Sequence, residues 1–235
     1  MFDRYQTLRR ELFGKRASEF MRAFPLLAEE FKRFKIRRLE EARELAPDFN
    51  IFRVMGVERD EVRLHSAMLA HLLDARASHG QRSLFMRGFL TMLSEKLGRT
   101  LDKELFRRGW SVRTEVVIPS TNPNVSIGRR LDIVLSSRER GCLVVIENKI
   151  DADEQYDQLK DYRAWMEKQR GTYSERILVF LTLDGRNPKS DEPTEILNLS
   201  YREDVVTWLS DCLKEILAPR VREIVQQYLG TIRNI

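Results

Sequence analysis

The order of apolar and polar residues predicts that the chain begins with helices. Over residues 5–24 and 25–46, apolar side chains recur at three- and four-residue spacings, which is the helical period. Pro25 opens the second of these helices in this interpretation, because proline is tolerated in the first turn. Charges alternate in blocks along the second helix, so much of its surface is expected to be solvated. This region either packs on the core or forms an arm that makes a homodimer.

Pro47 and Asn50 mark a break after these helices. We therefore divide the chain into an N-terminal helical extension, residues 1–56, and a domain, residues 57–235. Within the domain the apolar period changes from helical to strand-like and back. The predicted elements are helices at 60–75 and 79–98, strands at 110–119, 129–137 and 141–149, a helix at 151–169, strands at 176–183 and 194–200, and helices at 202–217 and 219–233. This order predicts an α/β fold, in which helices cover the faces of a mixed sheet.

Composition narrows the class of protein only slightly. The 235 residues are 42% hydrophobic and 33% charged, which is ordinary for a soluble globular domain. No apolar run approaches the roughly 18 residues that span a membrane, and the N-terminus has no apolar core segment of a secretory signal. We therefore expect a cytoplasmic protein with no membrane partner. The two cysteines lack metal-ligand spacing and are read as buried small residues. The net charge of +5 favours polyanions weakly.

One predicted strand ends in charged residues. In the stretch LVVIENKI, four apolar residues lead to Glu147, Asn148 and Lys149. Alternate strand residues share a face, so Glu147 and Lys149 point the same way and Asn148 points the other way. Asp132 lies on the preceding strand, and an antiparallel turn would bring it close to Glu147. Two carboxylates, with the backbone carbonyl of Asn148, form an oxygen-rich site for Mg²⁺ or Mn²⁺.

These residues resemble the motifs of the PD-(D/E)XK nuclease superfamily. The segment LDIVL with Asp132 precedes IENK with Glu147 and Lys149, and QLKDY follows with Gln158 and Tyr162. The last pair is similar to the QxxxY motif of the RecB-like branch. The combined pattern looks most like a bacterial family of hypothetical nucleases. Leu131 replaces the proline of the family's name. The resemblance implies a restriction-endonuclease-like fold and a nuclease that uses a divalent metal.

Further candidates follow from this resemblance, each with a structural alternative. In the functional interpretation, Gln158 and Tyr162 contact DNA phosphate or the water shell of the metal. In the structural alternative, they form a polar stripe of the helix, with Tyr162 packed on the sheet. Glu61 and His65 resemble the acidic or histidine position on the first core helix. Glu61 would be a further metal ligand and His65 would line the nucleic-acid site, unless they form an i,i+4 pair. Arg130 either contacts phosphate or neutralises the acids by a salt bridge.

The sequence therefore predicts a metal-dependent nuclease that hydrolyses phosphodiester bonds in DNA. Asp132 and Glu147 bind the metal, Lys149 positions or activates water, and Gln158 and Tyr162 support substrate or metal. The alternative is a catalytically silent module of the same fold that binds nucleic acid or protein. No glycine-rich phosphate loop, nucleophile elbow or zinc spacing supports small-molecule chemistry.

Overall fold

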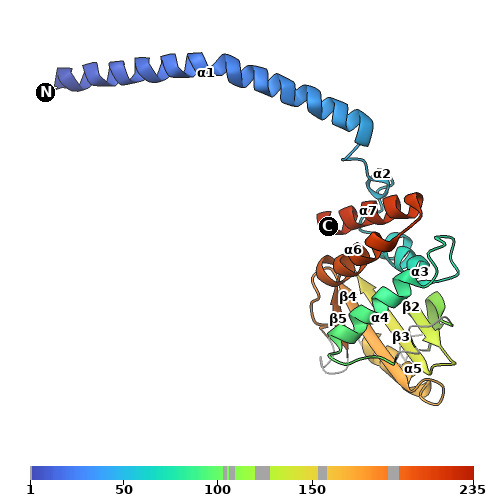
Figure 1. Cartoon of the computed structure of the whole chain (residues 1–235). Coiled ribbons are helices and arrows are strands. Elements are labelled where there is room, and N and C mark those ends of the chain that lie inside the picture. Colours follow the sequence, from blue (N-terminus) through green and yellow to red (C-terminus); the bar gives the residue numbers. More distant parts are fainter. Residues whose placement is uncertain (1, 103–104, 106–108, 120–127, 153–157, 190–195) are drawn as a thin grey trace. The chain divides into compact units, whose positions relative to one another are not determined.

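The computed structural model describes residues 2–102, 105, 109–119, 128–152, 158–189 and 196–235, with side chains of the first helix described from residue 20 on. In chain order the elements are α1 (Phe2–Leu45), α2 (Ile51–Val54), the π-helix η1 (Glu61–Ser66), α3 (Ala67–Leu73), α4 (Leu84–Lys96), β1 (Ser111–Ile118), β2 (Arg129–Ser137), β3 (Cys142–Lys149), α5 (Gln158–Lys168), β4 (Glu175–Thr182), β5 (Leu197–Ser200), the π-helix η4 (Tyr201–Val205), α6 (Val206–Glu215) and α7 (Pro219–Asn234) (Figure 1). The chain forms two compact units, residues 1–49 and 50–235.

The first unit consists mainly of the helix α1. It runs from Phe2 to Leu45 without interruption, with Pro25 in its interior. The prediction of two helices that meet at Pro25 was therefore wrong. Good helix formers flank the proline on both sides, and their summed preference offsets the roughly 3 kcal/mol that one interior proline costs. Among the described residues, no helix is long and apolar enough to cross a bilayer.

The second unit begins at Asn50, whereas the sequence placed the boundary after residue 56. Asn50 is the N-cap of α2, and its side chain accepts hydrogen bonds from the backbone of that short helix. Its amide nitrogen donates to the carbonyl oxygen of Gln227 at 2.7 Å and to the hydroxyl of Thr231 at 3.1 Å. Both partners lie on α7, so these hydrogen bonds attach α2 to the second unit.

A five-stranded sheet in the order β1-β2-β3-β4-β5 forms the centre of the second unit. The pairs β1–β2 and β2–β3 are antiparallel, and the pairs β3–β4 and β4–β5 are parallel. The crossover from β3 to β4 contains α5, as a parallel connection requires. The predicted mixed sheet flanked by helices is confirmed.

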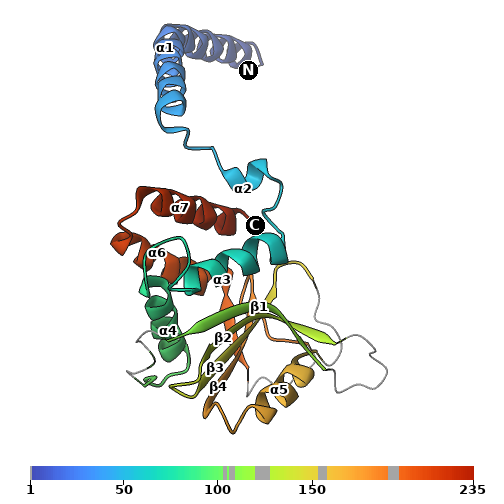
Figure 2. The ribbon, with the colours of Figure 1, turned by 90° about the vertical axis from the view of Figure 1, so that its right-hand side faces the viewer.

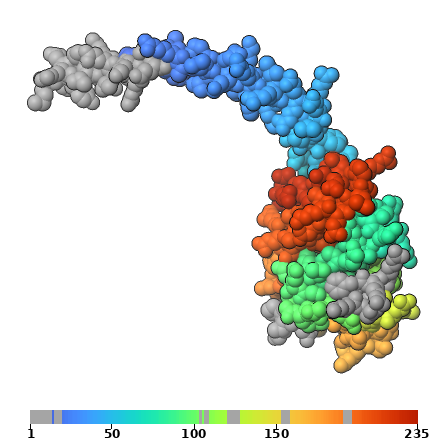
Figure 3. Space-filling model, viewed as in Figure 1, coloured from blue at the N-terminus to red at the C-terminus, as the bar shows by residue number. Residues whose placement is uncertain are grey.

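Two separate cores lie on the two faces of this sheet. On one face, Ile133 and Ile146 pack with residues of α3, α4, α6 and α7. On the other face, Val134 and Val145 pack with Leu159, Tyr162 and Met166 of α5. Figure 2 shows α5 on its own face of the sheet, and in Figure 3 residues of α4, α6 and α7 form much of the surface of the second unit that faces the viewer. The central strand β3 is buried along its whole length, which explains its apolar run.

Both cysteines are buried and unpaired, as the sequence predicted. Cys142 begins β3, and Cys212 lies on α6. Burial raises the pKa of each thiol to about 12, so neither is a reactive thiolate at neutral pH.

Candidate active site

The end of β3 presents alternate residues to the two faces of the sheet. Val145 belongs to the core against α5, and Ile146 belongs to the core on the opposite face. The alternation therefore directs Glu147 to the α5 side and Asn148 to the side of η1 and α3. The same strand thus supplies chemistry on one face and structural hydrogen bonds on the other.

Glu147 and Lys149 form a buried ion pair. The Lys149 ammonium lies 2.7 Å from Oε1 of Glu147, and the Glu147 side chain is fully buried. Neither oxygen of the Glu147 carboxyl group makes a hydrogen bond of good geometry with the described residues, although the Tyr162 hydroxyl lies close enough to lower its pKa. Burial, and then the negative charge of Asp132, raise the pKa of Glu147 to about 8, although Lys149 opposes this. A buried carboxylate oxygen without a partner is costly unless a cation or a proton occupies it.

Asp132 lies beside this pair on the neighbouring strand. The pairing of Ile133 with Ile146 places Asp132 opposite Glu147 on the antiparallel strands. Oδ2 of Asp132 accepts a hydrogen bond from the backbone N–H of Asn148 at 2.7 Å. Burial raises the pKa of Asp132, and this hydrogen bond only partly opposes the shift. The sequence-predicted proximity of Asp132, Glu147 and Lys149 is therefore present in the structure.

Lys149 stays charged in this environment. Burial alone would lower its pKa, but the negative charges of Glu147 and Asp132 raise the pKa above the ordinary value of lysine. A lysine whose pKa is raised is protonated at neutral pH, and in this state it can orient a water molecule and stabilise developing negative charge.

The donor set suits a hard divalent cation. Asp132 and Glu147 supply carboxylate oxygens, and the backbone of Asn148 lies beside Asp132, to which its N–H donates. No group of three or more His, Cys, Asp or Glu side chains is preassembled as a metal site in the described part of the chain. This arrangement fits Mg²⁺, which is usually held by one or two carboxylates and keeps several waters. It does not fit a structural zinc site, which needs four protein ligands.

Glu61 lies close to these groups but makes hydrogen bonds to the protein itself. Its Oε1 accepts from the backbone N–H groups of Ile150, Asp151 and Ala152, at 2.7, 3.0 and 3.0 Å. It thereby orders the backbone that leaves β3. An ion pair between Asp151 and Arg59 holds the same segment. The role of Glu61 as a further metal ligand stays a prediction.

His65 is placed differently from the sequence prediction. The ring is fully buried, with Nε2 2.9 Å from the carbonyl oxygen of Glu58 and Nδ1 3.0 Å from the hydroxyl of Tyr228. A carbonyl oxygen only accepts, so Nε2 carries the proton and Nδ1 accepts from tyrosine. Burial lowers the pKa of His65, so the ring stays neutral. Both nitrogens contact protein, so in this structure the ring has no surface that could contact nucleic acid. The alternative, an i,i+4 pair of His65 with Glu61, is not found among the hydrogen bonds of the described residues either, since both side chains bond to other groups. The backbone of η1 is also widened by the hydrogen bond from His65 N–H to the carbonyl of Asp60.

The side chain of Asn148 connects β3 with η1 and η4 on the other face of the sheet. Its Nδ2 donates to the carbonyl of Glu61 at 3.1 Å and to the hydroxyl of Ser66 at 2.9 Å. Its Oδ1 accepts from the hydroxyl of Tyr201 at 3.0 Å. Sequence reasoning considered only the backbone carbonyl of Asn148 and missed Ser66 and Tyr201. Ser66 was within reach of the sequence pattern, because it directly follows His65 on the predicted helix.

Gln158 and Tyr162 fasten α5 to the strand that carries Asp132. The Gln158 amide donates to the Tyr162 hydroxyl at 2.8 Å, and this hydroxyl donates to the carbonyl of Arg130. Beside them, a buried ion pair at 2.9 Å joins Arg129 to Asp161, a residue that the sequence analysis did not single out. Tyr162 is fully buried. Its packing on the sheet matches the structural alternative. A contact of Gln158 or Tyr162 with substrate stays a prediction.

Arg130 is exposed at the edge of the site and forms an ion pair with Glu115 at 3.0 Å. Glu115 lies on the edge strand β1, and its negative charge contributes to raising the pKa of Asp132. Its backbone is left-handed, with φ of 53°, which is uncommon for a residue other than glycine. A contact of Arg130 with phosphate stays a prediction.

A mixed sheet that carries Glu147 and Lys149 at the end of its central strand β3 and Asp132 on the adjacent strand β2 defines a nuclease-type α/β domain. Comparison with known proteins agrees, because residues 49–229 match the family model described as the PD-(D/E)XK nuclease superfamily. The chain belongs to this superfamily.

Comparisons with individual proteins add little to this assignment. No curated protein matches the chain. One solved structure, the crystal structure of a protein of unknown function, AF1548, matches with 14% sequence identity and a TM-score of 0.21. The match covers 65% of this chain and 100% of that one. A TM-score of this size carries no argument about fold or function.

Proposed function

We propose that the protein is a metal-dependent nuclease that hydrolyses phosphodiester bonds in DNA. The observation that supports this most directly is the buried Glu147, whose carboxylate oxygens lack a hydrogen bond of good geometry while Asp132 and Lys149 lie beside it. Burial of this carboxyl group is destabilising for the fold alone, and a site that exchanges its proton for a cation accounts for it. Membership in a superfamily whose members are generally nucleases supports the same reaction class.

The residues have distinct roles in this proposal. Asp132 and Glu147 would hold Mg²⁺ or Mn²⁺, with the backbone carbonyl of Asn148 completing the protein ligands. The metal supplies Lewis-acid chemistry, which acidifies water and neutralises charge on the phosphodiester. The Lys149 ammonium orients the attacking water and stabilises the charge that develops on phosphate. Tyr162 and Gln158 keep β2, and therefore Asp132, in position.

DNA is the proposed substrate for electrostatic reasons. The chain carries a net charge of +5, and Arg130 exposes 66% of its side chain beside the acids. A guanidinium at this point could exchange Glu115 for a phosphate oxygen when DNA binds. Contacts of this kind position the backbone without reading its sequence.

The test is incubation of the purified chain with supercoiled and linear DNA in the presence of Mn²⁺ or Mg²⁺, with EDTA as control. Metal-dependent cleavage is the expected result. If no substrate is cleaved, thermal unfolding with and without Mn²⁺ decides between two explanations. A melting temperature that rises with Mn²⁺ in the wild type but not in Asp132→Asn would indicate a metal site that lacks its substrate. No rise would favour the silent module.

The raised pKa of Glu147 predicts that metal binding depends on pH. Below about pH 8 this carboxylate is mostly protonated, and a cation must displace the proton. The affinity for Mn²⁺ is therefore expected to increase as pH rises from about 6 to about 8, by up to roughly tenfold per unit, and then to level off. Titration calorimetry in buffers of different ionisation enthalpy measures both the affinity and the released proton. Glu147→Gln, which cannot ionise, should lose most of the affinity, and an affinity of the wild type that does not change with pH would contradict the assignment.

A further inference from the structure

An apolar seam of five residues runs along α1. Phe20, Phe24, Leu27, Phe31 and Phe34 follow one another at spacings of four, three, four and three residues. This spacing averages 3.5 residues, which is the period of a two-stranded coiled coil. In the sequence the same alternation extends back to Ala17 and Phe13.

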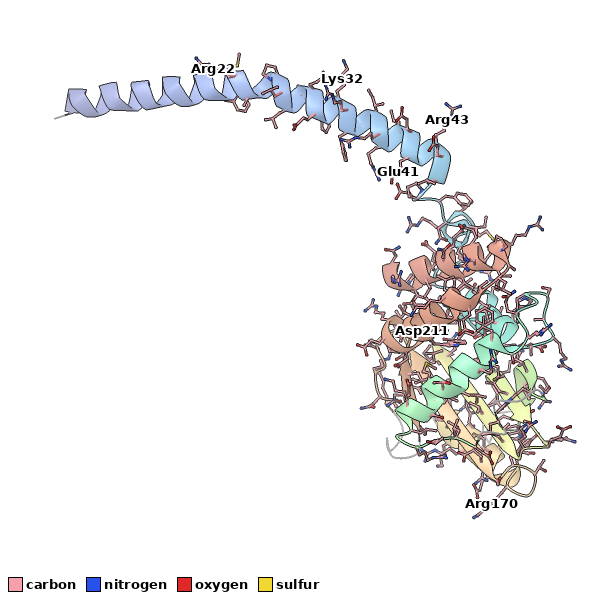
Figure 4. All side chains as sticks on the ribbon, in the orientation of Figure 1. Arg22, Lys32, Glu41, Arg43, Arg170 and Asp211 are labelled. Carbon is pink, nitrogen blue, oxygen red and sulfur yellow. The ribbon has the colours of Figure 1, made fainter. Side chains whose placement is uncertain are left out.

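The seam has no partner within the first unit. Each of its five side chains is 53–59% exposed. Pro25 directly follows the seam residue Phe24 and so lies off the seam line. Ion pairs lie away from the seam, such as the one between Arg33 and Glu29 at 3.6 Å. Figure 4 shows the side chains of α1, with Lys32 and Glu41 labelled. One stripe of this helix therefore exposes large aromatic side chains to water, at a free-energy cost that a partner would remove.

Charges that flank the seam favour an identical helix as this partner. With Phe24 and Phe31 at positions a, and Phe20, Leu27 and Phe34 at positions d, Glu30 occupies position g and Lys35 the following position e. In a parallel pair, g of one helix faces the next e of the other. Glu30 of each copy then meets Lys35 of the other copy, twice by symmetry. Lys35 already lies along the seam, with its ammonium 5.1 Å from the ring centre of Phe31.

We propose that α1 joins two copies of the chain as a parallel coiled-coil homodimer, with the Glu30–Lys35 pairs setting its register. The five seam residues leave about 100 Å² each exposed, or about 1,000 Å² over two copies, if a phenylalanine side chain offers roughly 200 Å². This reaches the lower limit of a specific interface before any flanking residue is counted. A membrane surface fits less well, because helices that lie on membranes carry mainly Lys and Arg on their polar face, whereas Glu29 and Glu40 lie outside the seam here.

Charge reversal in the full chain tests both the dimer and its parallel orientation. Sedimentation velocity of the wild type should give twice the mass of one chain. Glu30→Lys and Lys35→Glu should each raise the dimer dissociation constant by about tenfold, because two attractive contacts become repulsive. The double variant Glu30→Lys/Lys35→Glu should have the dissociation constant of the wild type again, because both pairs are attractive. An equimolar mixture of the two single variants should form a heterodimer, since each unlike pair is then attractive. In an antiparallel pair, position g faces g and position e faces e, so neither single variant would turn an attractive contact into a repulsive one.

Lys32→Glu is the matched control, because it reverses a charge at position b on the outer face and should leave the mass unchanged. A wild type that sediments as one chain, or as three or more, would overturn the proposal. So would single variants that dimerise as well as the wild type. Flotation with vesicles of phosphatidylglycerol and phosphatidylcholine tests the membrane alternative. A monomer that floats with the vesicles would contradict the dimer and indicate that α1 binds a membrane surface. None of these outcomes depends on nuclease activity, so failure of the proposed function leaves this test intact.

Discussion

Lys149→Ala is expected to reduce metal-dependent DNA cleavage by about 10²–10⁴-fold while leaving the fold intact. The substitution removes the ammonium that lies 2.7 Å from Glu147 and that we expect to orient water. The fold should survive because Glu147 can take up a proton once its partner is gone, since its pKa is already raised to about 8. Initial cleavage rates at saturating Mn²⁺ measure the effect, and circular dichroism measures the fold.

Lys214→Ala provides the matched control for this experiment. Lys214 is an exposed lysine on α6 with an ion pair to Asp211 at 2.6 Å, so its loss should change neither cleavage nor stability measurably. Asp132→Asn should also abolish cleavage, but for another reason. Its amide oxygen can still accept from Asn148, while the charge that would bind the metal is lost. Full activity in both Lys149→Ala and Asp132→Asn would show that the strand end is not the active site.

Asn148→Ala is expected to lower the free energy of unfolding by about 2–4 kcal/mol. The change leaves the carbonyl of Glu61 and the hydroxyls of Ser66 and Tyr201 without the amide that now bonds all three. Asn148 is 1% exposed, so water cannot easily replace it. For a unit of this size the melting temperature should fall by about 5–15 °C. Urea unfolding and calorimetry at the same pH check both values.

Asn234→Ala separates this effect from the loss of any asparagine. Asn234 is an exposed residue at the end of α7, with one hydrogen bond to the carbonyl of Gly230 at 2.8 Å. Its removal should change stability by no more than about 0.5 kcal/mol. The backbone carbonyl at position 148 is kept in Asn148→Ala, so the remaining folded protein should still bind Mn²⁺. Equal stability of the two variants would contradict the structural role of Asn148.

Local patterns were sufficient where one short segment carries the information. The strands β2 and β3 were predicted because β-branched residues are concentrated there and because turn residues separate them. Alternation along β3 placed Glu147 and Lys149 on one face. The antiparallel turn then implied that Asp132 lies nearby. These three residues needed no long-range information, because two adjacent strands determine their proximity.

Long-range packing decided the roles of the other candidates. His65 was expected at the nucleic-acid site, but its hydroxyl partner Tyr228 comes from α7, 163 residues later in the chain. The partners of Glu61 and Asn148 likewise lie more than 50 residues away from them. Polar residues at helical spacing look alike whether they contact solvent, substrate or the protein's own backbone. Only the tertiary structure specifies which of these three a given polar side chain contacts.

The sequence by itself determined the α/β class, the succession of strands along the chain, and the proximity of Asp132 on β2 to Glu147 and Lys149 at the end of β3, because strand alternation and a tight turn are local properties. The tertiary structure alone decided that Pro25 lies inside a single helix, that Glu61 orders the chain after β3, and that His65 and Tyr162 are buried. It also determined the electrostatics of Glu147, whose raised pKa results from burial between two cores and from a neighbouring carboxylate. Desolvation depends on everything that surrounds a group, and a linear pattern does not contain that information.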